Sequence, residues 1–198
     1  MKAPRLAKSA SAQLIALSPK RQLEDLVAVI SPDQIRDLVD PLLADILARI
    51  FLEARADEGT LWLIDHSRNE LSPIWNNGPN AARFAGHITQ SLGSGLISMV
   101  ATTEQPFLEN QVRKNLHQDR TIDETLGLRT ESLIAVPLHF LRRCRGVLSC
   151  VQLGDRTSRK RCAARGFSIA DLEVVQHGSA LVTCLFEHRL FSQVLGWK

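Results

Sequence analysis

The side chains that could do chemistry in this chain do not fall into a catalytic pattern. The four cysteines contain no C-x-x-C pair, and no G-x-S-x-G, H-E-x-x-H, Walker or dinucleotide-binding sequence occurs. His177 and His188 are eleven residues apart, about three helical turns, which is too far to bind one metal ion. The residues concerned are Cys144, Cys150, Cys162, Cys184, His66, His87, His117, His139, His177 and His188. The sequence therefore predicts neither an enzyme nor a metal site, and it predicts reduced thiols.

A second group of polar candidates lies where an apolar run begins. The group is Leu128, Arg129, Thr130 and Ser132. The two-residue period of a strand predicts that Thr130 and Ser132 share a face, which Ile134 and Val136 continue inwards. The two hydroxyls could orient a ligand by hydrogen bonds, with Arg129 adding charge for a phosphate or carboxylate. They could equally cap the preceding short helix or bond to local backbone.

Gly93-Ser94-Gly95 precedes an apolar segment that predicts a helix ending near Thr103. Free amide groups at the start of a helix can hold a phosphate. A tight turn between strand and helix needs the same glycines, and we favour that reading.

The candidate site must be positioned by the stretch Leu128 to Asp155, in which two apolar runs flank a basic connection. This pattern predicts a central β-hairpin, with Gly146 at the turn and both sheet faces covered. Pro137 cannot donate to a ladder, which places it at a bulge or where the neighbouring strand ends.

Apolar residues at helical spacing predict helices near both ends of the chain. One stripe runs over residues 23–30, and Ser31-Pro32-Asp33-Gln34 predicts a new helix start. A broad stripe follows over residues 35–51, in which Pro41 marks either a kink or a second helix capped by Asp40. Ser168 with Asp171 predicts the start of a final helix. Its stripe comprises Leu172, Val175, Leu181, Val182, Leu185, Phe186 and Leu190.

The remaining elements are shorter. We expect a hairpin of residues 60–65 and 71–75, short strands at 88–92 and 107–108, and a helix from Thr121 to about Gly127. The segment between Glu109 and Arg120 is polar and includes Asp119.

Three stretches together resemble the GAF domain family. LRTESLIAVPL, then RGVLSCVQLGD, then FSIAD resemble its second half, and ADEGTLWLIDHSRNELSPIW resembles its first hairpin. Glu104-Gln105-Pro106 departs from the usual Gly-x-Pro. The resemblance implies an α/β fold with an antiparallel sheet of about six strands. Terminal helices are expected on one face, and a lid over residues 107–130, including Asp119, on the other, above a small-molecule pocket. The polar content of this segment also fits an ordinary exposed connection.

The branches of the family imply different ligands. Leu128, Arg129, Thr130 and Ser132 match a stretch that borders the ligand in the cyclic-nucleotide branch, and Phe167 and Asp171 also match. Gly154-Asp155 and Leu172 replace the Asn-Lys and Glu of that branch. The free methionine sulfoxide reductase and bilin-binding branches use a cysteine in or near the lid, and this chain has none between Gly93 and Leu138. Haem held by a histidine such as His117 remains open.

Composition and charge set the wider expectations. The chain has 198 residues, 44% of them hydrophobic, and a net charge of +3. It contains no signal peptide pattern and no uncharged span of about 20 residues, so we expect a cytoplasmic protein without a membrane partner. Eight basic residues against one acid lie between Arg142 and Arg165. This excess could contact nucleic acid, but without a recognition motif we expect a solvated loop.

We therefore expect residues 1–20 to be flexible, 21–39 to form a helical extension, 40–190 to form the GAF domain and 191–198 to form a tail. The expected function is a non-catalytic sensor that binds a small molecule, with a cyclic nucleotide as one candidate. Its terminal helices are expected to form a homodimer and to signal to a partner or to an output domain outside this chain. An interaction module without a ligand is the main alternative, and a methionine sulfoxide reductase is a minor one. The cofactor is unknown.

Overall fold

The computed structural model describes residues 35–154 and 165–195. Its centre is a six-stranded sheet in the order β3-β2-β1-β6-β5-β4, in which every neighbouring pair is antiparallel. The strands are β1 (Glu58–Asp65), β2 (Glu70–Asn76), β3 (Gln90–Ser91), β4 (Phe107–Glu109), β5 (Thr130–Phe140) and β6 (Arg143–Leu153). The predicted mixed α/β fold is confirmed.

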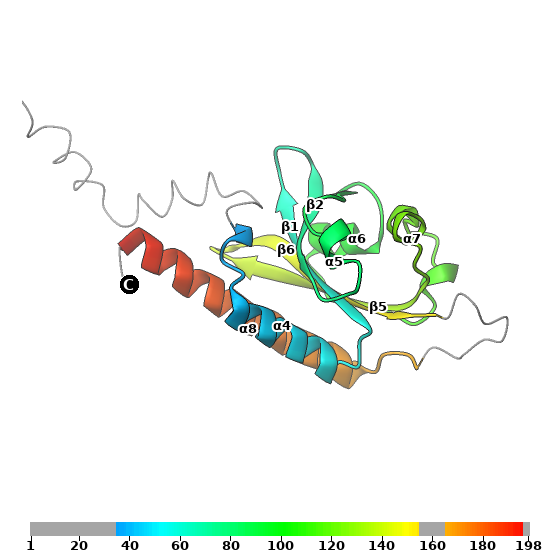
Figure 1. The fold of residues 1–198 in the computed structure, drawn as a ribbon. Coiled ribbons are helices and arrows are strands. Elements are labelled where there is room, and N and C mark those ends of the chain that lie inside the picture. Colours follow the sequence, from blue (N-terminus) through cyan, green and yellow to red (C-terminus); the bar gives the residue numbers. More distant parts are fainter. Residues whose placement is uncertain (1–34, 155–164, 196–198) are drawn as a thin grey trace, which may run out of the picture.

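Helices cover both faces of the sheet (Figure 1). The long helices α4 (Pro41–Glu53) and α8 (Ile169–Leu195) lie side by side on one face, where they enclose the larger core with Leu61, Ile134 and Leu148. The other face carries α5 (Ala81–Phe84), α6 (Leu96–Thr103) and α7 (Thr121–Leu126), together with the short 3₁₀ helix η1 (Val112–Lys114). We call residues 110–129, between β4 and β5, the lid.

Local capping fixes where the two long helices begin. The Asp40 carboxylate accepts a hydrogen bond from the Leu43 backbone N–H at 2.9 Å, and Pro41 occupies the first turn, so Pro41 begins a helix rather than kinking one. Arg189 near the end of α8 pairs with Asp40 at 2.8 Å. Ser168 and Asp171 form the predicted capping interaction at the start of α8.

The central hairpin is confirmed, but the predicted position of its turn is wrong. Leu141 and Arg142 form the connection, with φ angles of 52° and 63°, and Gly146 lies inside β6 opposite Leu63 and Leu138. Two consecutive left-handed residues are typical of the tight turn that matches strand twist. Pro137 lies beyond the segment of β5 that pairs with β4, so its missing N–H costs no ladder bond there.

The shorter elements agree with the sequence patterns, except that α5 and η1 were not foreseen and that the strand expected at 88–92 comprises only Gln90–Ser91. By length and composition alone, α8 contains a span, Ile169–Ser192, that could cross a membrane. The core helix of a globular domain meets the same criteria, and Val175, Val182 and Phe186 of α8 are fully buried in this one. Its apolar character therefore has an explanation within the fold.

Several expectations fall outside the described residues. They concern the flexible start, the helix over residues 23–30, the helix start at Ser31–Gln34, Cys162, and most of the basic loop after Asp155. Within the described part, Arg145 is 7% exposed in β6, so it is not one of the solvated loop residues that the charge pattern suggested.

Candidate functional site

A cavity of about 90 Å³ lies between the sheet and the lid. Its floor is formed by the lid-facing side chains of β1, β5 and β6, including Trp62, Leu133 and Val151, and its roof by Ile122, Leu126 and other residues of the lid. The Trp62 and Phe84 rings meet edge to face, with their centroids 5.3 Å apart. For comparison, an engineered cavity of about 150 Å³ admits benzene. The present cavity therefore suits a small ligand unless the lid moves.

Nine polar residues contribute to the wall of this cavity. They are Glu58, Thr60, Asn76, Gln90, Gln118, Asp119, Asp123, Thr130 and Ser149. The Trp62 indole N–H donates to Ser149 Oγ at 2.8 Å, and Asn76 Nδ2 donates to Thr60 Oγ1 at 2.9 Å. Gln90 Nε2 donates to Ser94 O at 3.0 Å. The nitrogen donors of these three side chains are thus engaged within the protein.

Glu58 is the most unusual group in the cavity wall, because it is a carboxyl residue only 6% exposed. Burial raises the pKa of this carboxyl, and hydrogen bonding with the Asn76 side chain opposes the rise. A charged carboxylate has about four acceptor positions. Glu58 therefore has acceptor positions beyond its hydrogen bond with Asn76.

Two aspartates fasten the lid over the cavity. Asp123 in α7 accepts hydrogen bonds from Thr130 Oγ1 at 2.8 Å and from Thr130 N at 3.0 Å. Asp119 accepts from Ser94 Oγ at 2.9 Å and from Thr121 N at 2.9 Å. Hydrogen bonds from Thr121 and Ser94 lower the pKa of the Asp119 carboxyl. Both aspartates are therefore structural acceptors in this closed arrangement.

The contact between Ser94 and Asp119 also bears on the glycine-led turn. The loop before α6 is joined to a carboxylate of the lid, and Gly95 has a φ of 90°, a conformation that favours glycine. These observations fit the reading of Gly93-Ser94-Gly95 as a tight turn.

The residues predicted as a site are only partly brought together. Leu128, Thr130 and Asp119 line the cavity. Arg129 does not, because its Nε donates to Glu131 Oε1 at 2.6 Å and its side chain lines a neighbouring groove. The hydroxyl of Thr130 is engaged with the preceding helix, which is the local role that the sequence left open.

The expectation that Thr130 and Ser132 share a face is wrong. A bulge places Thr130 opposite Leu153 and Ser132 opposite Gln152, so Glu131 is an extra residue in β5. Ser132 therefore points with Ile134 and Val136 towards α4 and α8, where it is fully buried and away from the cavity. Because side chains alternate between the two faces of a strand, one extra residue puts the residues before and after it on faces opposite to those expected.

Sequence reasoning missed Glu58, Asn76 and Gln90, which come from three different strands. The sequence did contain a signal for this site. Glu58, Thr60 and Trp62 occupy every second position of β1 and therefore share a face, and two of the three are polar. His117, the residue considered for haem, lies in a different, open groove and not in the cavity wall. Among the described residues there is no group of three or more side chains suited to hold a metal ion.

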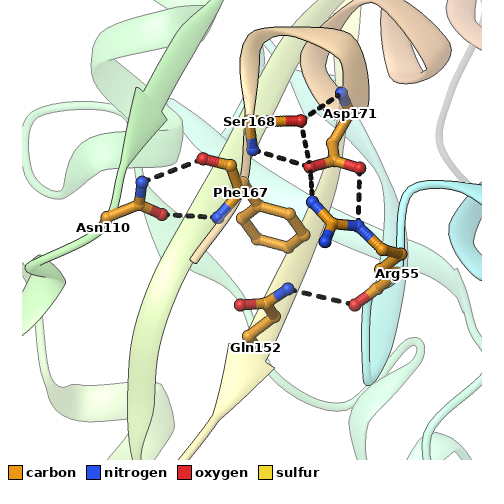
Figure 2. A network of polar contacts seen from close by, with 6 residues as sticks. All are labelled: Arg55, Asn110, Gln152, Phe167, Ser168 and Asp171. Atoms are coloured by element: carbon orange, nitrogen blue, oxygen red, sulfur yellow. Dashed lines mark hydrogen bonds and ion pairs between the residues drawn. The ribbon is translucent and has the colours of Figure 1, made fainter. Parts of the chain in front are cut away.

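A polar network joins the beginning of the lid to the beginning of α8 (Figure 2). Asn110 Nδ2 donates to Phe167 O at 2.9 Å, and Phe167 N donates to Asn110 Oδ1 at 2.7 Å. Asp171 then accepts from Ser168 N at 2.6 Å and from Arg55 Nε at 3.0 Å. Direct contacts therefore connect the beginning of the lid to the beginning of α8.

The fold has many solved relatives. The GAF domain of a phosphoenolpyruvate-protein phosphotransferase from Coxiella burnetii superposes with a TM-score of 0.61 at 17% identity, covering 91% of this chain and 99% of that one. The free methionine-R-sulfoxide reductase from Neisseria meningitidis gives 0.58 at 20% identity, covering 94% and 96%. The GAF-B domain of DevS from Mycobacterium smegmatis gives 0.58 at 16% identity, covering 79% and 99%. At these identities the similarity concerns the fold alone.

The sequence comparisons are more specific about the family than about the function. No protein of curated function matches the chain in sequence. The profile of the GAF domain, however, matches residues 39–183, which include the whole sheet and most of α8. The chain therefore belongs to the GAF domain family.

Proposed function

We propose that this domain is a non-catalytic sensor in which a small molecule binds between the sheet and the lid and thereby changes the environment of α8. The observation that carries the proposal is the cavity itself, an apolar space with a few polar groups under a lid held by side-chain hydrogen bonds. The network from Asn110 to Asp171 supplies a route to α8, from which a partner or an output domain would receive the signal.

The cysteines support a non-catalytic role. Cys144 and Cys150 are buried, and burial raises the pKa of both thiols, whereas a reactive cysteine has a lowered pKa. None of the described cysteines lines the cavity. These features favour a sensor over a reductase of the methionine sulfoxide type.

A cyclic nucleotide has weaker support than other small molecules. Its phosphate would need a cation or several free N–H donors. Arg113, Arg120 and Arg129 line a neighbouring groove, and none of them is in the cavity wall. Binding of a cyclic nucleotide would therefore require the lid to be rebuilt around it.

The function is tested by a thermal-shift screen of the full chain against purines, cyclic nucleotides, amines, amino acids and haem. A ligand that binds only the folded state stabilises it by mass action, by about 2.7 kcal/mol at a hundred times Kd. We expect at least one class to raise Tm, with chemical shift changes at the Trp62 indole. If no class does so, the interaction module replaces the sensor. The small volume of the cavity, whose wall Trp62 and Phe84 already occupy, is the observation that favours that second candidate.

The proposal includes a homodimer formed by the outer faces of α4 and α8. Among the described residues, six large hydrophobic side chains are exposed, and five of them belong to these two helices. They are Leu42, Leu52, Ile169, Leu181 and Phe191, while the sixth, Leu116, lies in the lid. Leu42 with Ile46, and Leu181 with Leu185, follow the four-residue spacing of one helix face. A second copy could cover this face in an isologous contact.

The double variant Leu42→Glu/Leu181→Glu is expected to be a monomer at micromolar concentration, where the wild type is a dimer. The charges would have to be buried without partners in the interface. Light scattering coupled to gel filtration measures this, and Leu116→Glu, on a side chain 97% exposed in the lid, is the control that should stay dimeric. A monomeric wild type, or an unchanged mass for the double variant, would contradict the dimer.

A further inference from the structure

The charged residues in the described wall of the cavity between lid and sheet are all acidic. Three carboxyl residues line it, Glu58, Asp119 and Asp123, and none of the described lining residues is a lysine, arginine or histidine. Asp119 and Asp123 fasten the lid through their oxygens, but each still contributes a negative charge beside the cavity. The electrostatic environment therefore disfavours an anion and favours a cation.

The hydrogen-bonding groups of the wall also favour a cation over an anion. The side-chain nitrogens of Trp62, Asn76 and Gln90 already donate to protein oxygens. The buried Oε1 of Gln118, by contrast, has no partner among the described residues, although a buried acceptor is normally satisfied. Glu58, 6% exposed, offers further acceptor positions. Both of these groups accept hydrogen bonds, so a ligand that pairs with them would have to bring the donor.

Two hydroxyls add a secondary feature. Thr60 and Ser149 accept bonds from Asn76 and Trp62, so each keeps its own proton to donate to a neutral polar atom. The rest of the wall is apolar, with Leu96, Ile97 and Leu126 among its members. A matching ligand would carry a protonated amine at one end and a compact apolar body.

We propose that the natural ligand of this cavity is a small organic cation whose ammonium group pairs with Glu58 and Gln118. This inference rests on the proposed sensor function and adds the chemical class of the ligand. It explains why a nearly fully buried carboxyl stands in the cavity wall, where an apolar residue would pack without desolvation cost. Because burial raises the pKa of Glu58, ammonium binding should weaken as the pH falls and the carboxyl becomes protonated.

The test compares isobutylamine, isobutanol and isobutyrate, which share a branched body small enough for the cavity and differ in their polar head. A primary amine is protonated at neutral pH, with a pKa of about 10.4 in lysine. Titrations of the full chain are followed by two-dimensional NMR at the Trp62 indole N–H, which lies in the cavity wall. We expect Kd for the amine to be at least tenfold lower than for the alcohol, and no measurable binding of the carboxylate.

Glu58→Gln should reduce the preference for the amine over the alcohol to about twofold or less, because a charge-assisted hydrogen bond becomes a neutral one. Glu124→Gln is the matched control, since Glu124 is an exposed acid in α7 outside the cavity wall, and it should keep the tenfold preference. Circular dichroism establishes that both variants are folded. If Glu58→Gln does not fold, the cation proposal is tested on the wild type instead. It then requires that the wild type prefers the amine over the alcohol and that this preference is lost at low pH.

The outcomes separate the two proposals. If the carboxylate or the alcohol binds best, or if the amine preference persists in Glu58→Gln, the cation proposal is wrong while small-molecule sensing stands. If the amine shifts signals only outside the cavity, or none of the three probes binds at millimolar concentration, the cation proposal also fails. Only a negative result in the wider screen overturns the sensor function.

Discussion

Replacing Gly146 with alanine is expected to destabilise the domain by at least about 3 kcal/mol, enough to unfold a marginally stable protein. A Cβ at this position would lie 2.0 Å from the backbone oxygen of Trp62 in β1. Neither strand can move aside easily, because β6 is paired with both β1 and β5. Urea denaturation followed by circular dichroism measures the loss, provided that the variant can be purified in a folded form.

Gly93→Ala is the control for this substitution. A Cβ at Gly93 would meet only Ser91 Oγ, at 3.6 Å, which is an ordinary contact. The control should stay within about 0.5 kcal/mol of the wild type. A Gly146→Ala protein as stable as this control would mean that β1 and β6 do not approach each other as closely as the structure has it.

Replacing Asp171 with asparagine is expected to lower the free energy of unfolding by about 2 kcal/mol at neutral pH. Asp171 is 5% exposed, pairs with Arg55 and caps α8 through Ser168, so it joins the turn after α4, the start of α8 and the end of the lid network in one place (Figure 2). Asparagine keeps the shape but loses the ion pair with Arg55, and it weakens the hydrogen bonds from Ser168, which are charge-assisted in the wild type. Asp45→Asn, on an exposed residue of α4, should change stability by less than about 0.5 kcal/mol.

The pH dependence provides a separate check on Asp171. The hydrogen bond from Arg55 is the largest of the effects that hold the pKa of this carboxyl at about 2, below its ordinary value of 3.8. A lowered pKa in the folded state gives stability that is complete above the unfolded pKa and is lost as the pH falls through the folded one. The stability difference between wild type and Asp171→Asn should therefore be constant above about pH 5 and shrink between pH 4 and pH 2. A difference that does not change with pH would exclude a charge effect.

Local sequence patterns predicted most helix and strand boundaries, for identifiable reasons. Asp40 with Pro41, and Ser168 with Asp171, satisfy the free N–H groups of their own helices, so the information lies within a few residues. Alternation and apolar runs likewise predicted β5 and β6 as a hairpin. Gly127 ends α7 in the left-handed conformation that glycine favours.

The errors arose where a residue responds to a partner distant in the chain. The sequence suggested that Gly146 is a turn residue. In the structure a glycine is required there because the backbone of Trp62, more than eighty residues earlier, leaves no room for a Cβ atom. Ser132 was assigned to the wrong face because a bulge at Glu131 depends on how β5 pairs with β6. Neither the close approach at Gly146 nor the bulge at Glu131 can be predicted from the spacing of neighbouring residues.

The sequence by itself therefore determined the family, the order of the elements and the part of the site that lies in one continuous stretch, namely Leu128 and Thr130 with the lid before them. Only the tertiary structure decided the chemistry of the cavity. Glu58, Asn76 and Gln90 belong to three separate strands, and they share a wall because the sheet places β1, β2 and β3 side by side. The arginines of the lid line a neighbouring groove instead, where Arg129 pairs with Glu131. Arg129 suggested a site for an anion in the sequence, whereas the fold placed three carboxyl residues in the cavity wall, with Glu58 buried, and left the arginines outside it.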